Sequence, residues 1–280
     1  MFTQYSLEHG KQVQAHEAAL RRAYRTLATE GSEWEDKIDT HFQFDPPKKA
    51  AIFSDLRDWS NSYNAFGNWV NLNSVLFASS NLETYLATVI RLAIQSDPGL
   101  TIGKSRLIDG TYLLRHPGSS PRDFEPLIAH CTMGDWQSRV SGLKYLFGTV
   151  PPEVTDSLNF LEEIRTLRNS IAHAIGRDIE DSRVHGVKQI LPIARLTRRR
   201  TNLLHTKIQL VAKAIDRQLL ANNIGEFQVI HFYHRLYPTL RTDIHPSERA
   251  MSLKNEVGKF GAMSPSKEFC KELVAYYEAL

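Results

Sequence analysis

One segment of the sequence, residues 153–176, places an acid–base group and a permanent cation within a helical pattern. Asn169 and His173 are four residues apart, so their side chains are neighbours on one helix face. Arg168 lies about 100° around the helix from Asn169, and helix geometry alone does not direct its long side chain toward His173. The polar stripe on this face consists of Glu162, Thr166, Asn169 and His173.

Arg168 and His173 have the chemistry that cleavage of an RNA phosphodiester requires. The forked guanidinium of arginine is always charged and suits a phosphoryl group, whereas histidine both accepts and donates a proton near neutral pH. Attack by the 2′-hydroxyl, which DNA lacks, needs one group that takes its proton, one that protonates the leaving oxygen and one that holds the phosphoryl charge. The alternative is a solvated helix face, which is what a polar stripe opposite an apolar one most often is.

The opposite side of the same segment is apolar and is expected to be buried. Its apolar residues recur at intervals of three and four, the spacing of an amphipathic helix. The predicted helix covers residues 153–175 and ends at Gly176. The stripe expected in the core consists of Phe160, Ile164, Leu167, Ile171 and Ile175.

Helical patterns also dominate the chain before this segment. Good helix formers predict a helix over residues 8–30, stopped by Gly31, and a second helix over residues 49–59. The Ser- and Asn-rich residues 60–68 are expected to form a linker. Apolar residues on one face then predict a long helix over residues 69–95.

The remaining elements are expected to be helices joined by loops. A long connection over residues 100–125 is followed by a predicted helix over residues 135–146. Residues 177–194 stay ambiguous between irregular structure and short strands. Thr197 is a suitable N-cap for a helix that reaches about residue 222. Three shorter helices are expected to start near Glu226, Pro246 and Pro265.

Residues 168–173 read RNSIAH and match the R-x4–6-H motif of HEPN domains, which often place a polar residue directly after the arginine. The wider sequence resembles the RiboL-PSP type of HEPN protein over residues 67–222. Four segments carry this resemblance in chain order, and they read ASSNLETYLATVIRLAIQSDPG, GDWQSRVSGLKYLFG, LEEIRTLRNSIAHAIG and TKIQLVAKAIDRQLL.

The resemblance implies an antiparallel four-helix bundle that usually forms a homodimer, with the two motifs facing each other in one composite site. Many members are metal-independent endoribonucleases of toxin–antitoxin and anti-phage systems, and others only bind RNA or protein partners. By this resemblance, Arg168 clamps the phosphate and stabilises the transition state, and His173 is the acid–base group. Asn169 then orients His173 or the substrate.

The fold class expected for the whole chain is all-α, an antiparallel four-helix HEPN bundle with helical extensions at both ends. The expected division has an N-terminal helical extension over residues 1–66 and a HEPN-like bundle over residues 67–222. A C-terminal helical extension covers residues 223–280.

Basic residues follow the motif directly in the chain. Residues 183–215 contain no Asp or Glu, although the formal net charge of the whole chain is only +3. A local basic stretch of this kind indicates an anionic partner, and the alternative is again a solvated helix face. Salt-dependent contacts with an RNA backbone are expected from Arg195, Arg198, Arg199, Arg200 and Lys207.

The composition excludes several other classes of function. A chain of 280 residues with 42% hydrophobic and 23% charged residues can bury a core without disulfide or metal staples. Its 2 cysteines form neither a disulfide framework nor a cysteine zinc site. His231 and His234 lack an acidic partner at ligand spacing. Neither a metal nor a cofactor is therefore expected.

No membrane segment is expected either. The N-terminal residues lack the apolar core of a secretory signal. The long uncharged run over residues 59–82 contains many Ser and Asn residues, whose insertion into a bilayer is too costly. These observations, together with the few cysteines, favour a cytoplasmic location.

The function expected from these residues is cleavage of RNA by a metal-independent HEPN endoribonuclease that acts as a toxin or an anti-phage effector. The expected partners are RNA, a second copy of the chain and, in such systems, an antitoxin or defence protein. The second hypothesis is a HEPN module without catalysis that binds RNA or protein through the same face. In a third, the chain is a helical scaffold in which Arg168 and His173 are structural.

Overall fold

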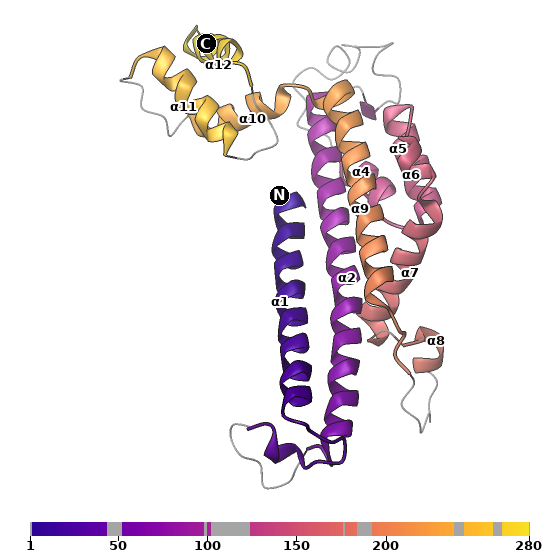
Figure 1. Cartoon of the computed structure of the whole chain (residues 1–280). Coiled ribbons are helices and arrows are strands. Elements are labelled where there is room, and N and C mark those ends of the chain that lie inside the picture. Colours follow the sequence, from indigo (N-terminus) through magenta and orange to yellow (C-terminus); the bar gives the residue numbers. More distant parts are fainter. Residues whose placement is uncertain are drawn as a thin grey trace. The chain divides into compact units, whose positions relative to one another are not determined.

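Every regular element of the described part of the chain is a helix, which confirms the all-α prediction (Figure 1). The computed structural model describes residues 2–43, 52–97, 100–101, 124–175, 177–183, 192–237, 244–259 and 265–279. The HEPN arrangement of four helices stays a prediction.

The elements up to the motif are α1 (Phe2–Thr29), η1 (Ile38–Thr40), α2 (Leu56–Ser96), α4 (Glu125–Thr132), α5 (Trp136–Phe147), α6 (Pro152–Thr155) and α7 (Leu158–Ala174). After the motif come α8 (Ile179–Ser182), α9 (Arg198–Leu219), the π-helical turn η3 (Leu220–Ile224), α10 (Phe227–Leu236), α11 (Pro246–Gly258) and α12 (Lys267–Ala279). The predicted starts of the last three helices are confirmed to within two residues.

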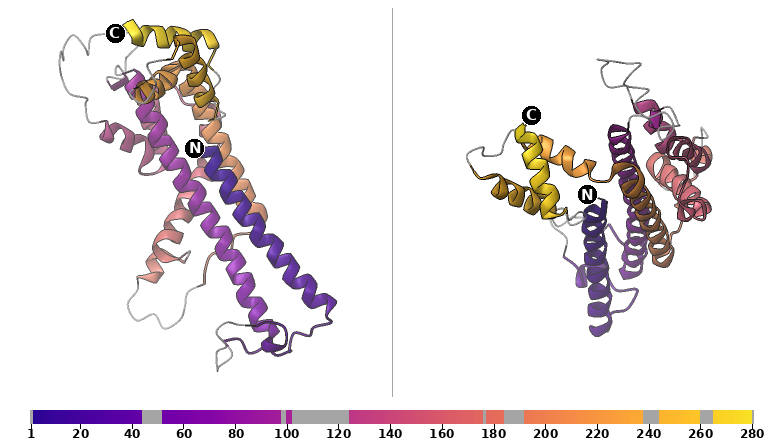
Figure 2. Two further views of the ribbon diagram at one scale, coloured as in Figure 1. Left: turned by 90° about the vertical axis from the view of Figure 1, so that its left-hand side faces the viewer. Right: turned by 90° about the horizontal axis from the view of Figure 1, so that it is seen from above.

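The first two helices form an antiparallel hairpin, visible in Figures 1 and 2. Apolar side chains close the turn between them, with Leu27, Ile38 and Leu56 buried against one another. Along the hairpin the contacts are both aromatic and polar. Tyr24 Oη lies 2.8 Å from Ser60 Oγ, and Asn81 donates a hydrogen bond of 3.1 Å to the carbonyl oxygen of Phe2. Only Val13 and Leu27 of α1 are buried.

The predicted linker over residues 60–68 is wrong, because α2 continues through it without a break. The polar side chains of this segment are compatible with a packed helix, since Ser60 and Asn68 find partners outside it and Asn61, Ser62 and Asn64 are exposed. Ser60 is bonded to Tyr24, and Asn68 forms hydrogen bonds with the backbone of Ala194 (2.9 Å) and Leu196 (2.8 Å). Of the helix predicted over residues 49–59, residues 49–51 lie outside the described part of the chain, and within the described residues 52–59 the helix begins at Leu56 as part of α2.

Helix α4 is an unpredicted element, which occupies the residues between the predicted connection over residues 100–125 and the helix predicted over residues 135–146. Residues 102–123 of that connection lie outside the described part of the chain. The segment that ends α4 runs so close to α5 that a Cβ atom at Gly142 would lie 2.7 Å from the carbonyl oxygen of His130. Only glycine fits at this position of α5 without a shift of the neighbouring backbone.

The helix predicted over residues 153–175 is divided into two. The short α6 ends at Thr155, and α7 begins at Leu158 and ends at Ala174. Ile175 terminates α7 in a left-handed conformation with φ 55°, a position usually taken by glycine. Thr197 is the N-cap of α9 as predicted, since its Oγ1 accepts a hydrogen bond of 3.2 Å from Arg200 N.

The chain divides into two compact units that do not follow the expected limits of residues 66 and 222. The first unit contains Met1–Thr88, Ala129–Lys144 and Thr149–Ala214, so the N-terminal hairpin belongs to the same unit as the motif. The second unit contains Val89–Ile128, Tyr145–Gly148 and Ile215–Leu280. Residue 66 itself falls within the continuous helix α2.

The interior of the first unit is built from α2, α5, α7 and α9. Its most deeply buried apolar side chains include Leu72, Val75, Leu82, Leu86, Trp136, Leu161, Ile164, Leu204, Ile208 and Val211. The apolar face predicted for the helix over residues 69–95 is thus confirmed at Leu72, Val75, Leu82 and Leu86. Helices α7 and α9 run antiparallel, because Arg200 at the start of α9 pairs with Glu163 whereas Lys207 lies over Phe160.

The second unit has a core of its own among α10, α11 and α12. Tyr233 is fully buried there, and its ring lies 4.9 Å from that of Tyr277. Arg249 is also buried and forms an ion pair with Glu278. The buried members of this cluster are Val229, Tyr233, Ala250, Leu253, Val257, Cys270, Leu273 and Val274.

Candidate functional site

The packed side of α7 differs from the predicted stripe. Leu161, Ile164 and Ile171 are the buried residues of the helix, whereas Ile175 is 59% exposed. Arg168 lies between Ile164 and Ile171 on this side, at the same spacing of three and four residues. The guanidinium of the motif therefore belongs to the side of α7 that faces its neighbours. Phe160 and Leu167, expected in the core, are half-buried.

Asn169 and His173 lie toward the outside of α7. His173 is exposed in the last turn of the helix, and Asn169 is half-buried one turn earlier. Arg168 Nη1 donates a hydrogen bond of 3.2 Å to Asn169 Oδ1, which links the arginine to the polar face. The side chain of Arg168 is 33% exposed, so a ligand can reach part of it.

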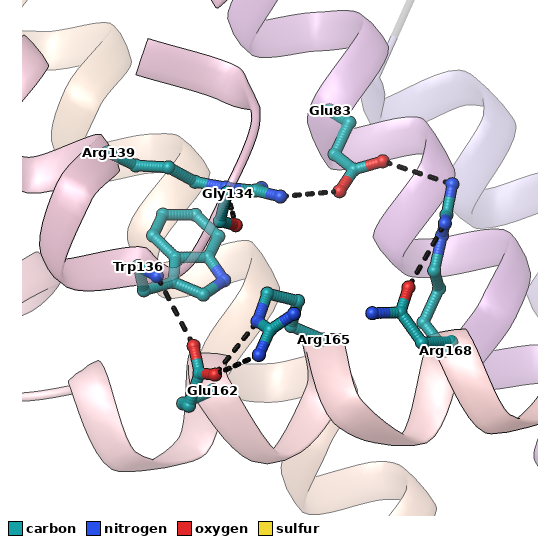
Figure 3. A network of polar contacts seen from close by, with 8 residues as sticks. Glu83, Gly134, Trp136, Arg139, Glu162, Arg165 and Arg168 are labelled. Carbon is teal, nitrogen blue, oxygen red and sulfur yellow. Dashed lines mark hydrogen bonds and ion pairs between the residues drawn. The ribbon is translucent and has the colours of Figure 1, made fainter. Parts of the chain in front are cut away.

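Arg168 is turned toward α2 and not toward the histidine of its own chain. Its Nη2 lies 3.6 Å from Glu83 Oε2, and the second oxygen of Glu83 accepts a hydrogen bond of 3.1 Å from Arg139 Nη2 (Figure 3). One carboxylate is thus shared by an arginine from α5 and the arginine of the motif. The Nε atom of Arg168 is buried and has no hydrogen-bond partner within the described residues.

Arg139 is the buried member of this network. It is only 4% exposed, its Nε donates a hydrogen bond of 3.1 Å to the carbonyl oxygen of Gly134, and its guanidinium lies 4.9 Å from the ring centre of Trp136. Neither Glu83 nor Arg139 stood out in the sequence. The available signal was the position of Glu83, which is the first charged residue after the uncharged run over residues 59–82.

The polar stripe suggested that Glu162 is solvated, but in the structure its carboxylate accepts hydrogen bonds from neighbouring residues. Its Oε1 accepts hydrogen bonds from Arg165, including one of 2.8 Å from Nε, and its Oε2 accepts one of 3.2 Å from Trp136 N (Figure 3). The hydrogen bonds from Arg165 hold the pKa of Glu162 below its usual value. This residue connects α7 to the start of α5.

The basic residues expected to bind RNA separate into free and paired groups. Arg195 and Arg199 are exposed, with no ion pair recorded in the described part of the chain. Arg198 pairs with Glu17 at 2.6 Å between Nε and Oε1, and Arg200 forms a bidentate pair with Glu163. Lys207 Nζ lies 5.0 Å from the ring centre of Phe160, a cation–π contact.

An open groove of about 550 Å³ runs between α7 and the segment that precedes α9. Asn68 and Asn71 of α2 hold that segment, since Asn71 donates a hydrogen bond of 3.0 Å to Leu196 in addition to the two bonds of Asn68. Arg195 thereby stands at the edge of the groove. The groove is lined by Asn159, Glu162, Glu163, Thr166, Leu167, Ser170, Arg195 and Leu196.

The structure thus brings Arg168 and Asn169 into contact and leaves His173 exposed beside them. Within the described residues, no three histidine, cysteine or acidic side chains are grouped so that they could hold a metal ion. Among the same residues, no helix has the length and apolar character needed to cross a membrane.

A comparison with models of protein families finds no match to this chain, and comparisons with curated proteins and with solved structures find none either. The functional assignment therefore depends on the residues and their geometry.

Proposed function

We propose that this chain is a metal-independent endoribonuclease of the HEPN type. The observation that carries the proposal is the end of α7, where the partly exposed Arg168 contacts Asn169 and the exposed His173 lies one turn beyond. A forked cation and an acid–base group are two of the groups that cleavage of RNA by its own 2′-hydroxyl requires.

In this reaction the 2′-oxygen attacks phosphorus and the bond to the 5′-oxygen breaks, which leaves a 2′,3′-cyclic phosphate and a free 5′-hydroxyl. His173 serves as the base that takes the 2′ proton or as the acid that protonates the leaving 5′-oxygen. Arg168 stabilises the charge that builds up on the phosphoryl oxygens, and Asn169 holds Arg168 through its side-chain oxygen.

The proposal includes a homodimer, because Arg168 and His173 of one chain do not point toward each other. Arg168 and His173 are five residues apart, so they project about 140° from each other around α7. Arg168 is in addition turned toward Glu83. A twofold axis beside α7 would place His173 of one copy beside Arg168 of the other and so complete the site.

The RNA backbone is proposed to follow the basic residues beside the groove. Arg195 and Arg199 are the strongest candidates because they are exposed and carry no ion pair in the described part of the chain. Arg198, Arg200 and Lys207 contribute less, since contacts with Glu17, Glu163 and Phe160 already occupy them. Action as a toxin or anti-phage effector in the cytoplasm, with an antitoxin or defence protein as partner, belongs to the same proposal.

The alternative is a non-catalytic module that binds RNA or a protein. The ion pair between Arg168 and Glu83 favours the protein-binding form of this alternative, since it partly neutralises the charge that would hold a phosphate.

A cleavage assay separates the two functions. The purified chain is incubated with single-stranded RNA in EDTA, and the expected products end in a cyclic phosphate. His173→Ala should remove cleavage, whereas His130→Ala, which changes another exposed histidine, should leave it intact. RNA binding without cleavage would support the module, and cleavage that needs an added divalent metal would contradict the proposed chemistry.

A further inference from the structure

Glu83 lies between two arginines that come from different helices. Each of its carboxylate oxygens faces one of them, with 3.1 Å to Arg139 Nη2 on α5 and 3.6 Å to Arg168 Nη2 on α7 (Figure 3). Neither Glu83 nor Arg139 belongs to the R-x4–6-H motif. The arrangement connects α2, α5 and α7 at the guanidinium that is proposed to hold the phosphate.

Arg139 fixes one side of this arrangement. It is 4% exposed and held by the carbonyl oxygen of Gly134 and the ring of Trp136. Both of these contacts involve residues at or just before the start of α5, so Arg139 is held by its own end of that helix. Its hydrogen bond therefore gives Glu83 a defined position on the α5 side.

Arg168 is held less tightly than Arg139. Its contact with Glu83 is longer than a hydrogen bond, and its side chain is 33% exposed. Two guanidinium groups share a single carboxylate, so the cluster keeps a net positive charge. A second anion at the exposed edge of Arg168 would complement this charge, and a phosphoryl oxygen has the required chemistry.

We infer that Glu83, anchored by Arg139, is a positioning residue that aims the guanidinium of Arg168 at the phosphoryl group of RNA. This inference rests on the proposed function. A free arginine side chain loses rotamer entropy when it is ordered. Because Glu83 and Asn169 order Arg168 before RNA arrives, less of that cost falls on the reaction.

Glu83→Gln tests the inference because it keeps the size of the side chain and removes its charge. The turnover number at saturating RNA should fall by about 10- to 100-fold, as expected when a reacting group is misplaced. The KM should stay the same or decrease, because the variant adds positive charge beside the RNA. Glu83→Asp keeps the charge on a shorter side chain and should recover part of the lost turnover.

Glu278→Gln is the matched control, since Glu278 also pairs with a buried arginine but lies in the second compact unit. This variant should lower the melting temperature without changing turnover of the folded protein. Faster cleavage by Glu83→Gln would show that Glu83 competes with RNA for Arg168, and would overturn the inference. Equal losses in Glu83→Gln and Glu83→Asp that follow the folded fraction would overturn it as well.

A second measurement keeps the inference separate from the proposed function. The Nε–Hε signal of Arg168 in a nitrogen-15 spectrum, assigned by its loss in Arg168→Lys, reports whether the guanidinium is held. It should be sharp in the wild type and should broaden or shift in Glu83→Gln. Absence of cleavage by the wild type would overturn the proposed function, whereas an unchanged Arg168 signal would overturn the positioning by Glu83 even if RNA is cleaved.

Discussion

The ring of His205 contacts Ser74 twice, with its Nε2 atom 3.0 Å from the hydroxyl oxygen and 3.1 Å from the carbonyl oxygen of that residue. The same hydroxyl lies 2.8 Å from Nε2 of His9, so α1, α2 and α9 meet at one serine. Because a carbonyl oxygen can only accept, Nε2 of His205 is the donor there. The serine hydroxyl is then free to donate to His9.

This arrangement predicts that acid destabilises the chain. Burial, followed by the nearby His9, lowers the pKa of His205 to about 4, and burial together with the charge of Arg198 lowers the pKa of His9. The unfolded chain therefore binds more protons than the folded chain between the ordinary pKa of about 6.5 and about 4. The contribution of His205 to the free energy of unfolding is fully present above pH 6.5. It decreases by about 3 kcal/mol as the pH falls from about 6.5 to about 4.

Urea unfolding at pH 7.5 and pH 4.5 measures this loss. His205→Gln removes the titrating group, so the dependence of its stability on pH should be clearly weaker over the same window. An equal dependence on pH in His205→Gln and in the wild type would show that other groups cause the loss.

The orientation of Arg168 predicts that the two residues of the motif work in trans. Since Arg168 is turned toward Glu83 and away from His173 of the same chain, each complete site should take one residue from each copy. Arg168→Ala and His173→Ala should each lower cleavage by at least about 100-fold. A mixed dimer of these two variants has one complete site, and should recover about half of the wild-type activity.

Co-expression of the two variants with different tags, followed by purification on both tags, yields the mixed dimer for this measurement. A mixed dimer of Arg168→Ala with the double variant is the control, and it should stay inactive. If the mixed dimer of the two single variants is also inactive, Arg168 and His173 act within one chain.

The division of the basic residues predicts two different effects of charge removal. Arg195→Ala combined with Arg199→Ala should weaken binding of single-stranded RNA and lower the slope of log affinity against log salt by about 1.5. Folding should be unaffected, because both side chains are exposed and no ion pair is recorded for them in the described part of the chain. Fluorescence anisotropy at several salt concentrations measures the slope.

Arg198→Ala and Arg200→Ala should behave differently, since they leave Glu17 and Glu163 without their partners. A loss of stability is expected with a smaller change in the salt slope. Replacement of Arg21 and Arg22, two exposed arginines of α1, is the matched control for net charge. An equal fall of the slope in that control would mean that RNA binding depends only on total charge.

The end of α7 predicts a stabilising substitution. Ile175 is 59% exposed and has φ 55°, a conformation that costs a β-branched residue about 1–2 kcal/mol. Ile175→Gly should therefore raise the free energy of unfolding by about 1 kcal/mol, since glycine adopts this conformation without strain. Ala174→Gly changes the preceding helical residue and should instead lower stability by about 1 kcal/mol. Thermal denaturation of both variants checks the sign of each effect.

Local signals in the sequence were enough to locate much of the helical structure. Thr197 marks the start of α9 because its hydroxyl can satisfy a free backbone N–H, and this requires no contact from elsewhere in the chain. The stripe of α2 and the starts of α10, α11 and α12 likewise follow from residue spacing and helix-start signals. The types and spacing of Arg168, Asn169 and His173 defined the candidate chemistry in the same way.

Only the tertiary structure decided which partners the polar side chains have. The Ser- and Asn-rich residues 60–68 resemble a linker, yet they are helical because Ser60 and Asn68 find partners on α1 and on the segment before α9. The sequence did not indicate in which direction Arg168 points from α7. In the structure it points toward Glu83, which lies on α2. In both cases the partner lies far away in the sequence, and a pattern confined to one helix contains no information about which distant group satisfies a buried charge or hydrogen bond.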